Sequence, residues 1–173
     1  MWGRIKRTLK HRWLDASTTR RAIPPDLVQR LAQRVAASEQ YHSGEIRIFV
    51  EAGLPLSYLW RDATTRQITR QRALAMFGKL RVWDTAHNNG VLIYLLLAER
   101  SIELVADRGL NDLIKSEVWR DMVAGMGNAF QQGRFEQGLT TALEEVSTLL
   151  ALHFPLKAGE INPNELPDSP VLN

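Results

Sequence analysis

The chain of 173 residues contains no cysteine. This absence excludes disulfide bonds, thiolate catalysis and cysteine-bound zinc, and it argues against a secreted, disulfide-stapled domain. Long apolar runs are also missing: the most apolar stretch, residues 91–98, has eight residues. A membrane-spanning helix needs about 20. The four histidines are far apart in the chain, so a helical metal-binding pair of histidines is not expected either.

Positive charge is concentrated at the start of the chain. Residues 1–21 hold seven Lys or Arg and one acid, whereas the remaining residues carry 15 basic and 18 acidic side chains. The net charge of +3 and the pI of 9.5 thus describe mainly this segment, and nucleic acid is not expected as a partner. Because no apolar core follows the basic residues, the segment is not a secretory signal, and a cytoplasmic location is expected.

Residues 1–22 have the spacing of a basic amphipathic helix, and we treat them as an N-terminal arm. Such an arm suits an anionic lipid surface, where each cation contributes about 1 kcal/mol, or a partner protein. The alternatives are an arm packed on the domain and a disordered arm. The residues expected to contact membrane or partner are Trp2, Arg4, Ile5, Lys6, Arg7, Leu9, Lys10 and Trp13.

The pattern from residue 23 to residue 155 predicts one domain with the element order α β α β β α α. Amphipathic spacing predicts helices over about residues 25–39, 66–82, from Ser116 to just before Gly133, and over 135–153. Thr65 is the expected cap of the second helix. In "EIRIFVEA", isoleucine and valine alternate with charged residues, which predicts the first strand.

Residues 91–106 are predicted to form a β-hairpin. Residues 91–98 form an apolar run, a turn follows at 99–101, and residues 102–107 alternate with a period of two. The first strand is expected to be buried on both faces and the second on one. The predicted fold is therefore a three-layer α-β-α sandwich of the α/β class, with a small mixed sheet that contains this central hairpin. Residues 156–173, rich in proline and poor in large apolar groups, are expected to be a disordered tail.

Polar segments flank the hairpin, and an antiparallel hairpin brings its two outer ends together. Carboxylate and carboxamide oxygens suit Ca²⁺ or Mg²⁺, and the nearby Arg108 suits a phosphate. The alternative is a set of turn formers and helix caps, with Gly109 at positive φ. The candidate metal ligands are Asp84, Asn88, Asn89, Asp107 and Asp112, with His87 and Asn111 beside them.

The stretches "SGEIRIFVE", "RVWDTAHNNGVLIYLLLAERSIELVADRG" and "VWRDMVAGMGNAFQQGRFEQGL" resemble the TPM-domain family over about residues 25–154. The relatives include thylakoid-lumen proteins of photosystem II repair with reported acid phosphatase activity. The resemblance implies an α/β sandwich and a divalent-metal or phosphatase site at the sheet end that holds the Asn-Gly loop. The chain departs from the commoner pattern at Asn88, which replaces an aspartate, and at Asp107-Arg108, which replace Gly-Tyr.

The resemblance also bears on partners. Family members are often encoded near LemA-type membrane proteins, which implies a membrane-associated partner, and the chain looks like a short branch that lacks the signal peptide and membrane segment of many relatives. Two functions follow as expectations. The first is an interaction module of undemonstrated activity, peripheral to the inner membrane. The second is a metal-dependent, acid-phosphatase-like hydrolase.

Overall fold

In the part of the chain that the structure describes, four strands form one mixed sheet. The structure is a computed structural model that describes residues 7–11, 14 and 16–173. The strands are β1 (Ile46–Glu51), β2 (Val91–Leu96), β3 (Ser101–Ala106) and β4 (Val171–Leu172). Their order is β3-β2-β1-β4; β1 runs parallel to β2 and β4, and β2 is antiparallel to β3. The predicted central hairpin is confirmed.

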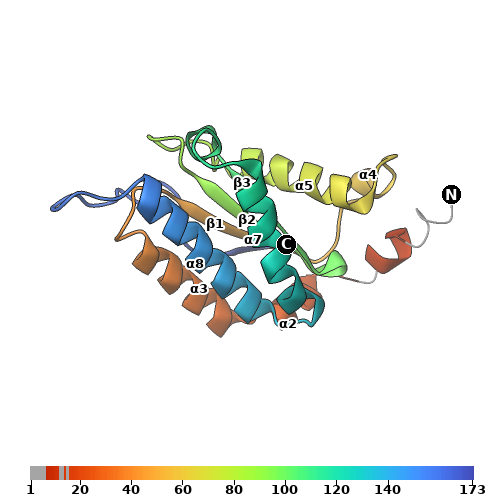
Figure 1. Ribbon diagram of the computed structural model, residues 1–173. Helices are drawn as coiled ribbons and strands as arrows, with labels where there is room; N and C mark the ends of the chain where they lie inside the picture. The colour runs from red at the N-terminus through yellow and green to blue at the C-terminus, as the bar shows by residue number, and fades with distance from the viewer. Residues whose placement is uncertain (1–6, 12–13, 15) are drawn as a thin grey trace.

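Helices cover both faces of the sheet (Figure 1). One layer contains α3 (Pro25–Ser38), α7 (Ser116–Gln131) and α8 (Phe135–His153), and the opposite layer contains α4 (Leu56–Leu59) and α5 (Thr65–Lys79). Successive side chains of β2 enter the two layers in turn: Val91 and Ile93 pack in the core of the first, Leu92 and Tyr94 in that of the second. The three-layer α-β-α sandwich is confirmed, and its covered sheet explains why β2 has no polar face.

Local signals set the helix ends. Pro25 occupies the first turn of α3, where its missing N–H is not needed. α5 begins with a capping box in which the Thr64 hydroxyl and the Gln67 side chain bond each other's backbone amides. The expected cap at Thr65 is therefore wrong by one residue. Gly133 adopts a φ of 73° after α7, as its position suggested.

The turn of the hairpin is a short 3₁₀ helix, η1 (Leu97–Glu99), followed by Arg100 in the left-handed region with a φ of 48°. The Arg100 guanidinium donates to the carbonyl oxygen of Gln131 over 2.6 Å. Because this carbonyl belongs to the last turn of α7, it has no partner within the helix. The hydrogen bond therefore joins the hairpin turn to the C-terminal end of α7.

The expectation of a disordered tail is wrong for its final part. Leu166 is buried, and its amide donates to Glu45 Oε2 over 3.0 Å. β4 then pairs with β1, and the amide of Asn173 donates to the carbonyl oxygen of Val50 over 2.9 Å. The composition of the tail is poor in apolar residues, but an open strand edge offers backbone hydrogen bonds that do not depend on composition.

Candidate functional site

The two polar segments that flank the hairpin meet at one end of the sheet. The amide of Asp107 donates to the carbonyl oxygen of Gly90 over 2.9 Å, and the amide of Gly109 donates to that of Asn88 over 2.9 Å. The loop before β2 and the chain after β3 are therefore neighbours in space. This juxtaposition follows from the antiparallel pairing of β2 with β3.

Glycine is needed at both of these contacts. A Cβ atom on Gly90 would lie 2.0 Å from the carbonyl oxygen of Val82, and one on Gly109 would lie 2.6 Å from that of Asn88. Positive φ occurs at Asn88, with a value of 52°, and Gly109 is not in that region. The expected positive φ at Gly109 is therefore wrong: this glycine allows two backbone segments to approach closely, and the asparagine makes the left-handed turn.

The three candidate carboxylates have different surroundings. Asp84 forms an ion pair with Arg81. Asp107 is the N-cap of α6 (Arg108–Asn111), and its Oδ1 accepts the amide of Arg108 over 2.7 Å. Asp112 is exposed and follows the last turn of α6. Within the described ranges, no group of three acidic or histidine side chains is placed to hold a metal ion, so the metal site stays a prediction.

The two candidate asparagines differ in burial. Asn88 is half-buried, and its Oδ1 accepts a hydrogen bond from Arg108 Nε over 3.0 Å. The guanidinium predicted to hold phosphate thus lies beside the Asn-Gly loop. Asn89 is fully buried; its amide donates to Thr85 Oγ1 over 3.1 Å, and its Nδ2 donates to Ser43 Oγ over 3.2 Å. Asn88 and Arg108 are brought together, whereas Asn89 turns toward the loop before β1.

Two buried oxygen atoms of the candidate metal ligands have no hydrogen-bond donor among the described residues. They are Asn89 Oδ1 and Asp107 Oδ2. Leaving a buried acceptor unsatisfied costs about 1–3 kcal/mol. Both are hard oxygen atoms of the kind that Ca²⁺ and Mg²⁺ prefer.

Buried charges along β1 are a feature that the sequence did not reveal. All six residues of β1 are buried, including Arg47 and Glu51. Glu51 forms an ion pair with Arg72 of α5 over 2.6 Å and accepts a hydrogen bond from Tyr94 Oη over 2.6 Å. Burial raises the pKa of Tyr94 above its usual range, and the adjacent carboxylate raises it further. Alternating charges are typical of a strand, but they do not tell whether its second face is covered.

A second group of buried acids lies at the start of β1. Glu39 Oε1 accepts the amide of Ile46 over 3.1 Å. Burial raises the pKa of Glu39 to about 8, and the nearby Glu45 adds to this shift. Burial likewise raises the pKa of Glu45. Near neutral pH the Glu39 carboxyl is therefore mostly protonated and is a poor ligand for a cation.

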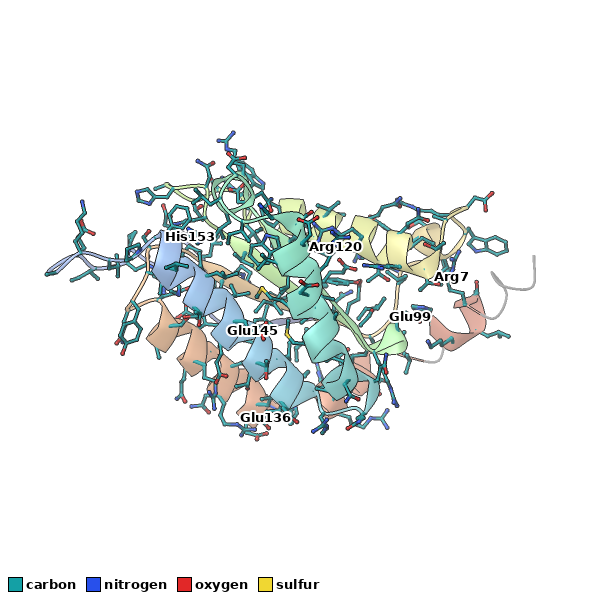
Figure 2. All side chains as sticks on the ribbon, viewed as in Figure 1. Arg7, Glu99, Arg120, Glu136, Glu145 and His153 are labelled. Carbon is teal, nitrogen blue, oxygen red and sulfur yellow. The ribbon has the colours of Figure 1, made fainter. Side chains whose placement is uncertain are left out.

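The described part of the arm packs on the domain. Residues 7–11 are helical, and Arg7 donates to three backbone carbonyl oxygens beside α4, those of Leu59, Arg61 and Ala63. Lys10 pairs with Glu99 over 2.7 Å, and the buried His11 contacts the same carboxylate over 2.8 Å. Figure 2 shows Arg7 and Glu99 at this end of the molecule.

Other predicted contact residues of the arm are placed differently. Leu9 is described and exposed. Trp2, Arg4, Ile5, Lys6 and Trp13 lie outside the described residues. Two of the cations expected to meet lipid, Arg7 and Lys10, are thus bonded to the domain, in line with the packed alternative.

The fold and the sheet end define a class: a three-layer α/β sandwich whose Asn-Gly loop meets the chain that leaves a central hairpin. The chain belongs to the TPM domain family, whose model matches residues 19–149. A solved structure similar to it is the NMR structure of the BA42 protein from the psychrophilic bacterium Bizionia argentinensis. That similarity has a TM-score of 0.68 and 27% sequence identity, and it covers 83% of this chain and 90% of the other. No curated protein matches the chain.

None of the helices in the described residues is both long and apolar enough to cross a bilayer.

Proposed function

We propose that this TPM-domain protein is an interaction module that docks on an anionic membrane surface through the end that carries the arm. The observation that carries the proposal is the surface around α4. There Leu9, Leu56 and Trp60 are exposed to 54%, 58% and 62%. Arg7 holds the arm against the residues that follow α4, so these apolar side chains belong to one end of the molecule.

The chemistry of this end suits a lipid interface. Tryptophan and leucine side chains enter the boundary between headgroups and acyl chains, while arginine and lysine stay with the phosphates. Arg61 lies over the ring of Tyr58, 3.8 Å from its centre, which keeps a cation beside Trp60. The basic residues of the arm add long-range attraction to anionic lipid.

Flotation with vesicles tests this proposal. Vesicles of phosphatidylglycerol and phosphatidylcholine should bind the full chain, vesicles of phosphatidylcholine alone should not, and added salt should weaken the binding. Trp60→Ala should reduce the bound fraction about fivefold, because an inserted indole is lost. The matched control is Leu152→Ala, whose side chain is exposed to 70% next to His153, at the far end of the molecule (Figure 2).

Equal losses from Trp60→Ala and Leu152→Ala, or no preference for anionic lipid, would contradict the membrane proposal. Binding to vesicles of pure lipid would also show that a LemA-type membrane protein is not required for docking.

A metal-dependent hydrolase is a second candidate, and the unpartnered oxygens of Asn89 and Asp107 favour it. Asn89, Asp107 and the remaining candidate ligands would hold Ca²⁺ or Mg²⁺, and Arg108 would orient a phosphate. Hydrolysis of p-nitrophenyl phosphate with each ion tests it. Turnover that disappears in Asp107→Asn, while vesicle binding persists, would establish the hydrolase; the interaction module predicts no metal-dependent turnover.

A further inference from the structure

A groove of about 820 Å³ runs along β3, the outermost strand on one side of the sheet. Its walls are α5 and α7, which cover opposite faces of the sheet (Figure 1). The α7 wall includes Trp119 and Val123, and the α5 wall carries Arg66 and Arg70. The groove therefore has an apolar side and a basic side, with a strand edge between them.

The backbone of β3 presents alternate residues to this groove. Asp107, just after β3, bonds to Gly90, just before β2, so by antiparallel alternation Val105 and Glu103 also bond inward, toward β2. The N–H and C=O groups of the residues between them point outward. These residues are Ile102, Leu104 and Ala106.

Side chains of the protein cover part of this edge. Arg70 donates to the carbonyl oxygen of Leu104 over 2.5 Å, and Asn111 Nδ2 donates to that of Ala106 over 2.7 Å. Both bonds confirm the outward direction of these carbonyl groups. They occupy acceptors and leave the outward N–H groups of the strand to an incoming chain, which would supply carbonyl oxygens.

The charge of the groove is opposite to that of the domain around it. Outside residues 1–21 the chain carries 15 basic and 18 acidic side chains. The charged side chains that line the groove are nevertheless three arginines, Arg66, Arg70 and Arg120, and a single acid, Glu103. Arg120 lies on α7 near α5 (Figure 2). Its pairing with Glu117 is between two exposed side chains and is weak.

Polar atoms at the groove also lack partners. The Trp119 side chain is more than nine-tenths buried, and its indole Nε1 has no acceptor among the described residues. Ser101 Oγ, on β3, is also buried and has no hydrogen-bond partner among the described residues. Tryptophan is only a donor, so the group that satisfies it must be an acceptor, such as a carbonyl or carboxylate oxygen.

We propose that this groove binds an extended segment of a partner protein in which acidic residues alternate with apolar ones. The segment adds to β3 as a further strand, by backbone hydrogen bonding to residues 102, 104 and 106. Successive side chains of a strand point to opposite faces. Its apolar side chains therefore meet Trp119 and Val123, and its carboxylates meet Arg66 and Arg70. This partner site lies along β3, whereas the proposed membrane-docking surface lies around α4.

The test uses the full ¹⁵N-labelled chain and a short, blocked peptide of alternating glutamate and valine. Addition of the peptide should shift the backbone amide signals of residues 102, 104 and 106 and slow their hydrogen exchange, with less effect on the inward amides of 103 and 105. Arg66→Glu should raise the Kd about tenfold or more, because an attraction becomes a repulsion. Lys79→Glu makes the same change of charge on α5 outside the groove and should leave the Kd within about twofold.

Two further peptides separate charge from pattern. Replacing glutamate by lysine should abolish binding. Rearranging the same residues into blocks of glutamate and valine should weaken it, because the two faces of the strand are then no longer distinct. Absence of β3 shifts with the alternating peptide, equal binding of the lysine peptide, or equal losses from Arg66→Glu and Lys79→Glu would overturn the proposal.

A second copy of this chain is the competing occupant of the edge. If the protein sediments as a dimer and the outward amides of β3 are already protected without peptide, β3 pairs with itself and the proposal is wrong. Vesicle binding is measured in a separate experiment, so neither peptide binding nor dimerisation at β3 decides the membrane proposal.

Discussion

The two sides of the sheet differ in how their strand edges are covered. At the β1 edge the chain's own C-terminal residues form β4, and Glu51, which forms a buried ion pair with Arg72, accepts a hydrogen bond from the Asn173 side chain beside it. At the β3 edge, two side chains cover backbone carbonyl groups and a groove remains. An uncovered edge attracts other strands, and proteins usually protect both. This difference is the basis of the proposal that the β1 edge serves stability and that the β3 edge binds a partner.

Charges make the same distinction. The Glu51 side chain at the β1 edge is 1% exposed and that of its partner Arg72 is 13% exposed. The corresponding values for Glu103 and Arg70 at the β3 edge are 17% and 43%. Water and salt screen the second pair far better than the first, so similar residue types contribute differently at the two edges.

The largest expected effect is at the closed edge. Arg72→Met should lower the free energy of unfolding by about 3–5 kcal/mol, because it leaves the buried Glu51 carboxylate without its cation. Urea unfolding followed by circular dichroism measures the change. Replacing both residues, in Arg72→Met with Glu51→Gln, should recover part of the loss. A loss below about 1 kcal/mol for the single variant would mean that the ion pair of Glu51 with Arg72 is exposed to water and not buried.

The next effect concerns the tail. Leu166→Ala should lower the free energy of unfolding by about 2–3 kcal/mol, since it leaves a cavity where the tail meets the layer of α4 and α5. The exposed Leu152→Ala is the control and should change it by less than about 0.5 kcal/mol. If urea unfolding gives equal losses of stability for the two variants, Leu166 is not packed in the core, and the disordered tail that the composition predicts would be correct.

A pH effect tests the burial of Glu39 at the start of β1. The pKa of Glu39 is raised from 4.5 to about 8 in the folded protein, so folding takes up a proton within this window. The free energy of unfolding should therefore fall as pH rises from 4.5 to 8, with a slope of up to about 1.4 kcal/mol per pH unit.

Glu39→Gln removes the titrating group and should flatten this slope in urea unfolding measured at a series of pH values. Glu144→Gln, which changes an exposed side chain on α8, should leave the slope of the free energy of unfolding against pH unchanged. A slope that survives Glu39→Gln unchanged would assign the pH dependence to another group.

The smallest expected effect is at the open edge. Arg70→Ala should change the free energy of unfolding by less than about 1 kcal/mol, because its pairing with Glu103 is partly exposed. The same urea experiment measures it beside Arg72→Met. If the two variants lose equal stability, the proposed contrast between a structural and a binding edge does not hold.

The regular elements of this fold could be predicted from the sequence because they have long, periodic patterns. The hairpin at 91–106 and the helix at 135–153 are confirmed for this reason. β4 could not be predicted: it has two residues, too few for any period, and it forms because β1 leaves an edge for it. The burial of Arg47 and Glu51 depends on which segments cover that side of the sheet, and this is decided by tertiary packing.

The candidate site was predictable in position but not in the orientation of its side chains. Antiparallel pairing of the backbone places the Asn-Gly loop beside Asp107, independently of the side-chain conformations. Whether Asp107 faces a cation or caps α6, and whether Asp84 pairs with Arg81, depends on local contacts of similar energy. The groove beside β3 gives no signal in the sequence, because α5 and α7, its walls, are far apart along the chain.

Native-state hydrogen exchange of the free protein tests the contrast between the two edges most directly. We predict that the outward amides of Ile102, Leu104 and Ala106 exchange much faster than the amides of Ile46 and Ala52, which bond to Glu39 and to Asn173 at the closed edge. Equal protection at the two edges would contradict the account, because β3 would then already be covered and would have no place for a partner strand.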